Sequence, residues 1–327
     1  MTRRALVAPA WIGKLPSRGD FVRSTGQPAL VRTMDDWLSQ GIELMSADAR
    51  WKEIYDRRPS AHFAFFSAGQ PRAVAGHLMA SSDASGRRFP FVVAGAFEVA
   101  ESLAFLPCAP LALARLWSRF EAVAKAAATA QDPGATLAEF AKTETELEVD
   151  AAAYEATLRD FVELQTMASV QQMLEDAGHA LDLRQAILAI GLLLQPVLGS
   201  SVQSLNKGLR LPLPEDPLYR PLVAGCWLQM VAPFLRRLDL EIGLFLPRQG
   251  RTPGLSIGFA GGSPEHLHAM FDPDVAAESF IEPTPAQWIE DQVHQDYAVS
   301  KLSSYLVQPQ LSLRQALATF RETFLGA

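Results

Sequence analysis

The chain is poor in cysteine and has no long apolar run. Its two cysteines, Cys108 and Cys226, do not form a C-x-x-C pair, so the sequence predicts neither a disulfide framework nor a cysteine-rich metal site. The longest apolar run, Ala186–Leu194, is far shorter than the roughly 20 residues that span a bilayer. Ala5–Ala10, the apolar run near the first residue, is too short for a signal peptide. We therefore expect a cytoplasmic protein with no integral membrane segment.

Positive charge is scarce as well. The chain has 29 Lys and Arg against 36 Asp and Glu, a formal net charge of −7. This balance provides no concentrated basic face, so nucleic acid is not an expected partner. With 49% hydrophobic and 20% charged residues, the composition is that of a globular protein with a sizeable core. The length of 327 residues favours two domains, or one domain with insertions.

Negative charge is concentrated in one segment. Residues 139–163 contain eight acidic and two basic side chains, a net charge of −6. Apolar residues three or four apart in the same segment predict a helix. Two interpretations of its charge stay open. It is either the solvated outer face of a helix packed on the core, or a docking surface for a basic partner.

The first hundred residues show the pattern of a helix followed by strands. A helix is expected over Pro28–Ser46, because apolar residues recur on one face and a proline opens the first turn. A second, short helix is expected over Trp51–Tyr55. Strands are expected over three segments rich in Phe, Val and Ala, namely His62–Phe66, Ala73–Ala80 and Phe89–Phe97. The last two should form an antiparallel hairpin, because the eight residues between them are too few for a parallel crossover.

Helical character dominates from about residue 103 to 196, and strands return after that. The elements expected there are a helix over Tyr219–Leu238, strands over Glu241–Leu246 and Gly254–Ala260, a helix capped by Ser263 that runs to Phe271, and tail helices over Pro285–Tyr297 and Leu313–Phe324. This order favours an α/β fold in which a mostly antiparallel sheet carries helices on both faces.

The segment Gly13–Val22 is dense in residues that shape the backbone. Its two glycines permit positive φ, and its proline restricts φ. Asp20 can hydrogen-bond local backbone amides and pair with Arg18 or Lys14. This composition favours a tight turn at a sheet edge, although Lys14 and Arg18 could instead contact an acidic partner surface. The residue order of a phosphate-binding P-loop is missing.

Residues Ser81–Arg88 are a second motif, at the tip of the expected hairpin. A solvated loop is the common role of such a polar tip. The functional interpretation is that Asp83 and Arg87 pair across the tip and hold it as a recognition loop.

Several fragments that resemble enzyme motifs do not combine into a catalytic site. Ser204–Lys207 matches S-x-x-K, but the motifs that accompany it in enzymes do not follow. His266 and His268 are two residues apart, so they would not share a helix face as metal ligands. His62 and His77 lie in expected strands and fit core or edge positions better than catalytic ones. We therefore expect no enzymatic activity, no metal and no cofactor.

Together the motifs resemble the TagF (ImpM) family of type VI secretion accessory proteins. The resemblance is carried by Gly13–Val22 with the helix around Asp36-Trp37-Leu38, by Gly76–Phe91 and, more loosely, by Trp227–Phe271. It covers about residues 5–100 well and about residues 218–275 weakly. A helical insertion at about 135–200 and the tail depart from the family pattern. The resemblance implies a TagF-like domain over residues 1–275, which includes the insertion, and a C-terminal helical extension over residues 276–327.

Resemblance to this family also implies a longin-like fold with α/β/α layers and a non-enzymatic role. Family members are associated with holding type VI secretion off after translation and with binding the forkhead-associated (FHA) domain protein of the system. The expected function is therefore negative regulation by sequestering that partner. The alternative is a structural or assembly scaffold of the apparatus, which the acidic segment and the tail suggest. The candidate partner-binding residues are Lys14, Ser17, Arg18, Asp20, Ser81, Asp83 and Arg87.

Overall fold

A sheet of nine strands dominates the described part of the chain. The computed structural model describes residues 3–57, 60–199, 205–248, 252–283 and 287–326. From one edge to the other the strands are β11 (Phe280–Ile281), β8 (Gly208–Pro212), β10 (Gly254–Gly258), β9 (Glu241–Pro247), β4 (Ser60–Ser67), β5 (Arg72–Met79), β6 (Phe91–Glu98), β2 (Pro9–Gly13) and β3 (Val22–Arg23). Neighbours are antiparallel except β11 and β8, which run parallel. The predicted, mostly antiparallel sheet is confirmed.

The strands predicted in the first hundred residues form the middle of this sheet. They correspond to β4, β5 and β6, and β5 pairs with β6 in the predicted antiparallel hairpin. Successive residues of a strand point to opposite faces, so Phe63 and Ala64 of β4 lie in different hydrophobic clusters. Both faces of the sheet are therefore buried.

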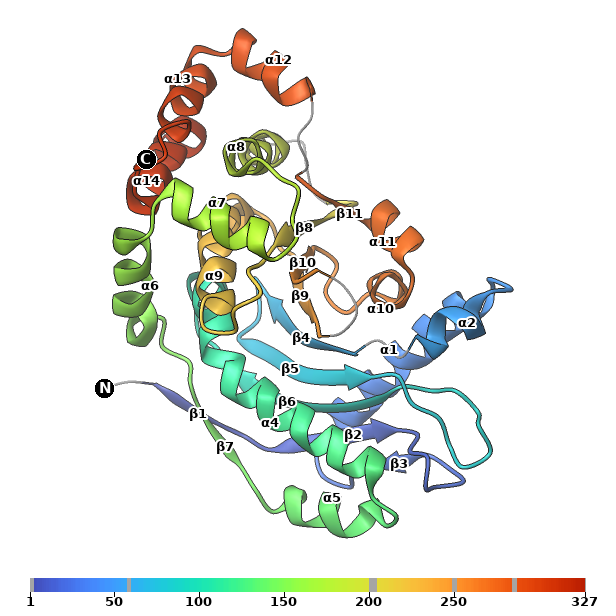
Figure 1. Ribbon diagram of the computed structural model, residues 1–327. Helices are drawn as coiled ribbons and strands as arrows, with labels where there is room; N and C mark the ends of the chain where they lie inside the picture. Colours follow the sequence, from blue (N-terminus) through green and yellow to red (C-terminus); the bar gives the residue numbers. More distant parts are fainter. Residues whose placement is uncertain (1–2, 58–59, 200–204, 249–251, 284–286, 327) are drawn as a thin grey trace.

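One face is covered by helices from both ends of the chain (Figure 1). These helices are α1 (Pro28–Ser46), α2 (Trp51–Asp56) and α10 (Pro264–Phe271). The first has the predicted bounds. Ser263 caps α10 as predicted, since its side chain accepts a hydrogen bond from the backbone N–H of His266. Gly41 of α1 lets the helices approach, because a Cβ there would lie 2.3 Å from the Leu267 side chain.

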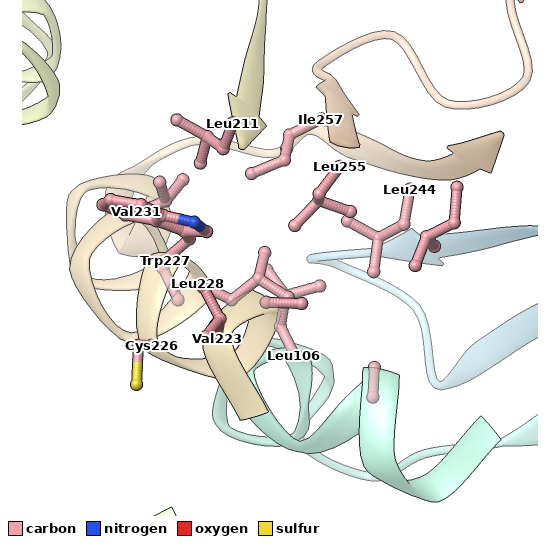
Figure 2. Close-up of a cluster of buried hydrophobic side chains, with 14 of the residues drawn as sticks. Leu106, Leu211, Val223, Cys226, Trp227, Leu228, Val231, Leu244, Leu255 and Ile257 are labelled. Carbon is pink, nitrogen blue, oxygen red and sulfur yellow. The ribbon is translucent and has the colours of Figure 1, made fainter. Parts of the chain in front are cut away.

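The opposite face carries α4 (Ala109–Thr129) and α9 (Arg220–Val231). Figure 2 shows Trp227 and Leu228 of α9 lying toward Leu255 and Ile257 of β10. These helices complete the predicted α/β/α layering. The helix predicted over Tyr219–Leu238 changes at residue 231 into a 3₁₀ helix, because Pro233 cannot donate the backbone hydrogen bond of an α-helix.

The acidic segment is not one continuous helix. It holds the end of α5 (Pro133–Ala141), the strand β7 (Thr145–Glu148) and most of α6 (Ala152–Leu164). β7 pairs antiparallel with β1 (Arg4–Val7) in a separate two-stranded sheet. The helix prediction is wrong at β7. Polar and apolar residues alternate in β7, so that Leu147 is buried. Pairing with the distant strand β1 decides the conformation of β7, and the spacing of local residues does not reveal that pairing.

The tail packs against the helices that precede β8. The remaining helices are α3 (Ser102–Phe105), α7 (Met167–Asp176), α8 (Leu183–Leu194), α11 (Pro273–Ser279), α12 (Gln287–Gln295), α13 (Tyr297–Leu306) and α14 (Leu313–Leu325). Helices α12, α13 and α14 all contact α8 (Figure 1). The predicted helix Leu313–Phe324 is confirmed, whereas residues 285–286 of the helix predicted over 285–297 lie outside the described residues. Among the described helices, none is long and apolar enough to cross a membrane.

Candidate interaction site

The first motif forms a loop at one edge of the sheet. β2 ends at Gly13, and the chain returns as the edge strand β3. The backbone N–H of Arg18 donates to the carbonyl of Leu15 at 3.0 Å and closes the turn. Gly13 has a φ of 140°, and a Cβ there would lie 2.1 Å from the Pro90 carbonyl oxygen. Only glycine lets the loop approach the start of β6 so closely. The predicted turn at a sheet edge is confirmed.

Asp83 is the centre of the second motif. Its side chain is fully buried. It accepts hydrogen bonds from the backbone N–H of Ser85 at 3.0 Å and from that of Arg87 at 2.9 Å. The side chains of the same residues also donate to it, Ser85 Oγ at 2.7 Å and Arg87 Nε at 2.6 Å. Lys14 Nζ lies 3.1 Å from the same carboxylate. Burial acts to raise the pKa of Asp83, but the hydrogen bonds from Ser85, Arg87 and Lys14 outweigh it and hold that pKa well below its usual range. The predicted Asp83–Arg87 pair is confirmed.

Backbone contacts also fasten the two loops to each other. The N–H of Ala84 donates to the carbonyl of Arg18 at 2.8 Å. Arg87 Nη2 donates to the carbonyl of Gly19 at 2.7 Å. Together with the Lys14–Asp83 ion pair, these contacts make one rigid unit of two segments that lie about 65 residues apart in the chain.

Arg18 and Asp20 do not pair with each other. The Arg18 guanidinium instead forms an ion pair with Asp132, which caps α5 by accepting from the N–H of Gly134 at 2.9 Å. Asp20 accepts a hydrogen bond from the N–H of Phe21 at 2.8 Å. The predicted contact of Asp20 with a local amide is confirmed. Lys14 and Arg18, the cations that could have paired with Asp20, instead form ion pairs with Asp83 and Asp132.

The candidate residues separate into two groups by burial. Lys14 and Asp83 are buried, and Ser81 is half-buried. The exposed members are Ser17, Arg18, Asp20 and Arg87. They belong to two exposed stretches, residues 16–20 and residues 84–87, which we call the motif surface. A partner can contact this second group directly, whereas the buried residues hold the loops in place.

These loops fall within a recognised domain. Residues 10–143 match the family model described as TagF N-terminal domain, Type VI secretion system-associated. The chain contains a TagF N-terminal domain. The match includes both motif loops and α5, and it ends just before β7. The TagF domain thus contributes every candidate residue as well as Asp132.

One solved structure, PA0076 from Pseudomonas aeruginosa PAO1, is 25% identical to the chain, with a TM-score of 0.33. The alignment covers 41% of this chain and 62% of that chain, so it spans less than two thirds of the relative. No curated protein matches the chain.

Two residues of the TagF domain contact the loops without having been predicted. The local sequence could have indicated Asp132, because Asp-Pro-Gly before a helical pattern is typical of a capped helix start. No local sequence pattern indicates the contact made by Tyr55 of α2. Its hydroxyl donates to the carbonyl of Ser81 at 2.9 Å and accepts from the same residue's N–H at 3.0 Å. Burial raises the pKa of Tyr55, so the hydroxyl stays protonated.

A buried polar cluster lies beside the TagF motif loops. His62 and His77 face each other across β4 and β5, with their Nδ1 atoms 3.1 Å apart. His62 Nε2 is 3.5 Å from Glu121, which also binds Lys125 at 2.7 Å and Arg248 at 3.3 Å. Burial lowers the pKa of both histidines, that of His77 to about 4, so both are neutral at pH 7.

This cluster has the donor types of a zinc site, and its ligand atoms lie within 4.8 Å of one another. However, Lys125 and Arg248 already neutralise Glu121, and two adjacent cations oppose a divalent ion. The cluster is better explained as a buried network of polar contacts. Ser204 of the S-x-x-K fragment lies outside the described residues.

Proposed function

We propose that this protein represses type VI secretion after translation, by binding and sequestering the FHA-domain component of the system in the cytoplasm. The TagF N-terminal domain supports a place in that system. The observation that carries the proposal is the motif surface, because both family motifs contribute to one exposed, internally braced patch. The role is that of a binding protein and not of an enzyme.

The exposed arginines give this surface its chemistry. Arg18 pairs with the exposed Asp132, and Arg87 reaches a backbone carbonyl and Asp83. Exposed ion pairs are worth only about 0–1 kcal/mol, so a partner can replace Asp132 at little cost. Guanidinium groups bind carboxylates in a bidentate manner. An acidic patch on the FHA-domain component is therefore the expected counterpart.

A secretion assay tests the regulatory direction. Deleting the gene should raise the amount of tube protein released into the medium, and overproduction should lower it. If deletion abolishes release, the protein is a structural or assembly scaffold instead. Unchanged release in both strains would contradict repression.

A binding assay tests the mechanism. The purified protein should form a complex with the purified FHA-domain component, measurable by calorimetry. The variant Arg18→Ala should weaken the complex at least about tenfold, as truncation of a hot-spot arginine does. Arg159→Ala is the matched control, because Arg159 is exposed on α6, outside the TagF domain. Equal loss in both variants would contradict a role of the motif surface.

A further inference from the structure

A cavity opens beside the motif surface. Its volume is about 640 Å³, and both motif loops line it, the first with Pro16 and the second with Ser81, Ser82, Gly86 and Arg88. The rest of the wall comes from α2, the start of β4, the end of β5 and the last turns of α4. This volume is within the range of about 300–1,000 Å³ that is typical of ligand pockets. A protein seated on the motif surface would also cover this opening.

Buried polar atoms in this cavity have no partner. They are Ser60 Oγ, His77 Nε2 and Ser81 Oγ, which make up three of the five unpartnered buried side-chain atoms within the described residues. His77 is 0% exposed and Ser60 is 6% exposed. Leaving such atoms unpaired costs free energy, and folded proteins rarely do so without a ligand or water. The cavity is thus equipped for hydrogen bonds that the described residues do not make.

The polar cluster behind His77 sets the kind of hydrogen bond that His77 can make. The Glu121 carboxylate beside His62 favours a proton on His62 Nε2, which leaves His62 Nδ1 as an acceptor. His77 Nδ1 then donates across the 3.1 Å contact. His77 Nε2 is left with a free lone pair in the cavity wall. The guest that fits this position carries an N–H or O–H donor.

The charges around the cavity favour a neutral guest. Arg88 Nη2 is 2.5 Å from Asp56, and Lys125 Nζ is 2.7 Å from Glu121. Each described cation that lines the cavity therefore already has a carboxylate partner. A charged guest would have to break one of these pairs or remain uncompensated, which is unfavourable at a half-enclosed site.

We propose that the cavity receives a neutral side chain of the hydroxyl or carboxamide class from the protein bound at the motif surface. Its N–H or O–H donates to His77 Nε2, and Ser60 and Ser81 bind its other polar atoms. This inference rests on the proposed function. The cavity would thus hold one side chain of the partner, in addition to the contacts that the exposed arginines make at the motif surface.

The test uses calorimetry with the full chain and the purified FHA-domain component. Ala128→Phe narrows the cavity from α4 and should weaken binding at least about tenfold. Ala122→Phe, at an exposed position of the same helix that does not line the cavity, should leave the Kd unchanged. The double variant Ser60→Ala, Ser81→Ala should weaken binding about fivefold or more. It should not lower the Tm, because the hydroxyls it removes have no partner among the described residues of the free chain.

The two proposals fail in distinguishable ways. If Arg18→Ala weakens binding while the cavity variants bind like the wild type, the motif surface is correct and the cavity inference is overturned. If the wild type does not bind the FHA-domain component, both proposals are overturned. Mass spectrometry of the denatured protein gives a further check, since a small molecule that co-purifies with the wild type and is lost in Ala128→Phe would overturn a protein side chain as the occupant. The serine double variant keeps the test valid if Ala128→Phe does not fold.

Discussion

Asp83 and Arg18 belong to neighbouring motif loops but have different physical roles. Asp83 is buried beneath five hydrogen bonds and ion pairs, whereas Arg18 is exposed and held by one exposed carboxylate. A buried, satisfied carboxylate stabilises local structure, and removing it leaves its partners unpaired. An exposed arginine contributes little to stability and remains available for contact. Burial therefore separates the residues that hold the site from those that bind.

The first prediction concerns Asp83→Ala. This change should lower the Tm by roughly 5 °C or more, because it leaves the buried Lys14 ammonium without its counter-charge. Differential scanning calorimetry measures the shift. Asp160→Ala is the control, since Asp160 is exposed and pairs only loosely with Arg159, and its Tm should change by about 1 °C or less. Equal shifts in the two variants would show that Asp83 does not hold the loops.

The second prediction concerns Asp20→Ala. Asp20 is exposed and accepts one hydrogen bond from the adjacent N–H. The free energy of unfolding should therefore change by less than about 0.5 kcal/mol, as for an ordinary surface substitution. Binding of the FHA-domain component should weaken at the same time, because the exposed Asp20 carboxylate would no longer accept hydrogen bonds from the partner. Urea unfolding and calorimetry on the same protein measure both. A loss of 1 kcal/mol or more with normal binding, on the order of a lost cap, would assign Asp20 a structural role.

At the scale of secondary-structure elements, the site depends on a helix that neither motif includes. Helix α5 presents Asp132 to Arg18 and uses the same carboxylate to cap its own first turn. The family match extends through this helix. The loop, the hairpin tip and the start of α5 thus meet at one corner of the sheet (Figure 1).

The third prediction concerns Asp132→Ala. Loss of the N-cap should cost about 1 kcal/mol of unfolding free energy. It also releases the Arg18 side chain, so partner binding should be retained or strengthened. Gln131→Ala, at the exposed neighbouring position, is the control for stability. Weaker binding by Asp132→Ala would mean that the partner requires Arg18 in the position that Asp132 sets.

At the scale of the whole molecule, the histidines couple the fold to pH. Burial is the main cause that lowers the pKa of four of them, namely His62, His77, His266 and His268. In the folded chain these imidazoles bind protons less readily than in the unfolded chain, where their pKa is near 6.5. The unfolded state therefore binds more protons between pH 6.5 and the folded pKa of about 4 for His77. The contribution of these histidines to the free energy of unfolding is fully present above pH 6.5 and decreases as the pH falls.

The fourth prediction follows from this linkage. The free energy of unfolding should fall between pH 6.5 and 5, with a slope that approaches about 1.4 kcal/mol per pH unit near pH 5 for each buried histidine that titrates only in the unfolded state. Urea unfolding across this range measures the slope. His77→Gln should reduce the slope, because the variant lacks one of these groups. A stability that is constant from pH 7 to 5 would contradict neutral burial of the histidines.

Local sequence determined most of the secondary structure and part of the site. Helix α1, the β5–β6 hairpin and the Asp83–Arg87 pair could be predicted, because apolar periodicity, proline position and short loop length act over a few residues. The same applies to the turn after Gly13. These features arise from near neighbours in the chain, and the TagF motifs lie within them.

Tertiary structure alone decided the rest, because the deciding contacts join distant residues. β7 is a strand only because β1 pairs with it, and Arg18 binds Asp132 only because α5 ends up beside the first loop. The register of β4 and β5 places His62 opposite His77, whose Nε2 has no partner among the described residues. The sequence by itself identified the loops, and packing determined which of their residues are buried supports and which are free to bind.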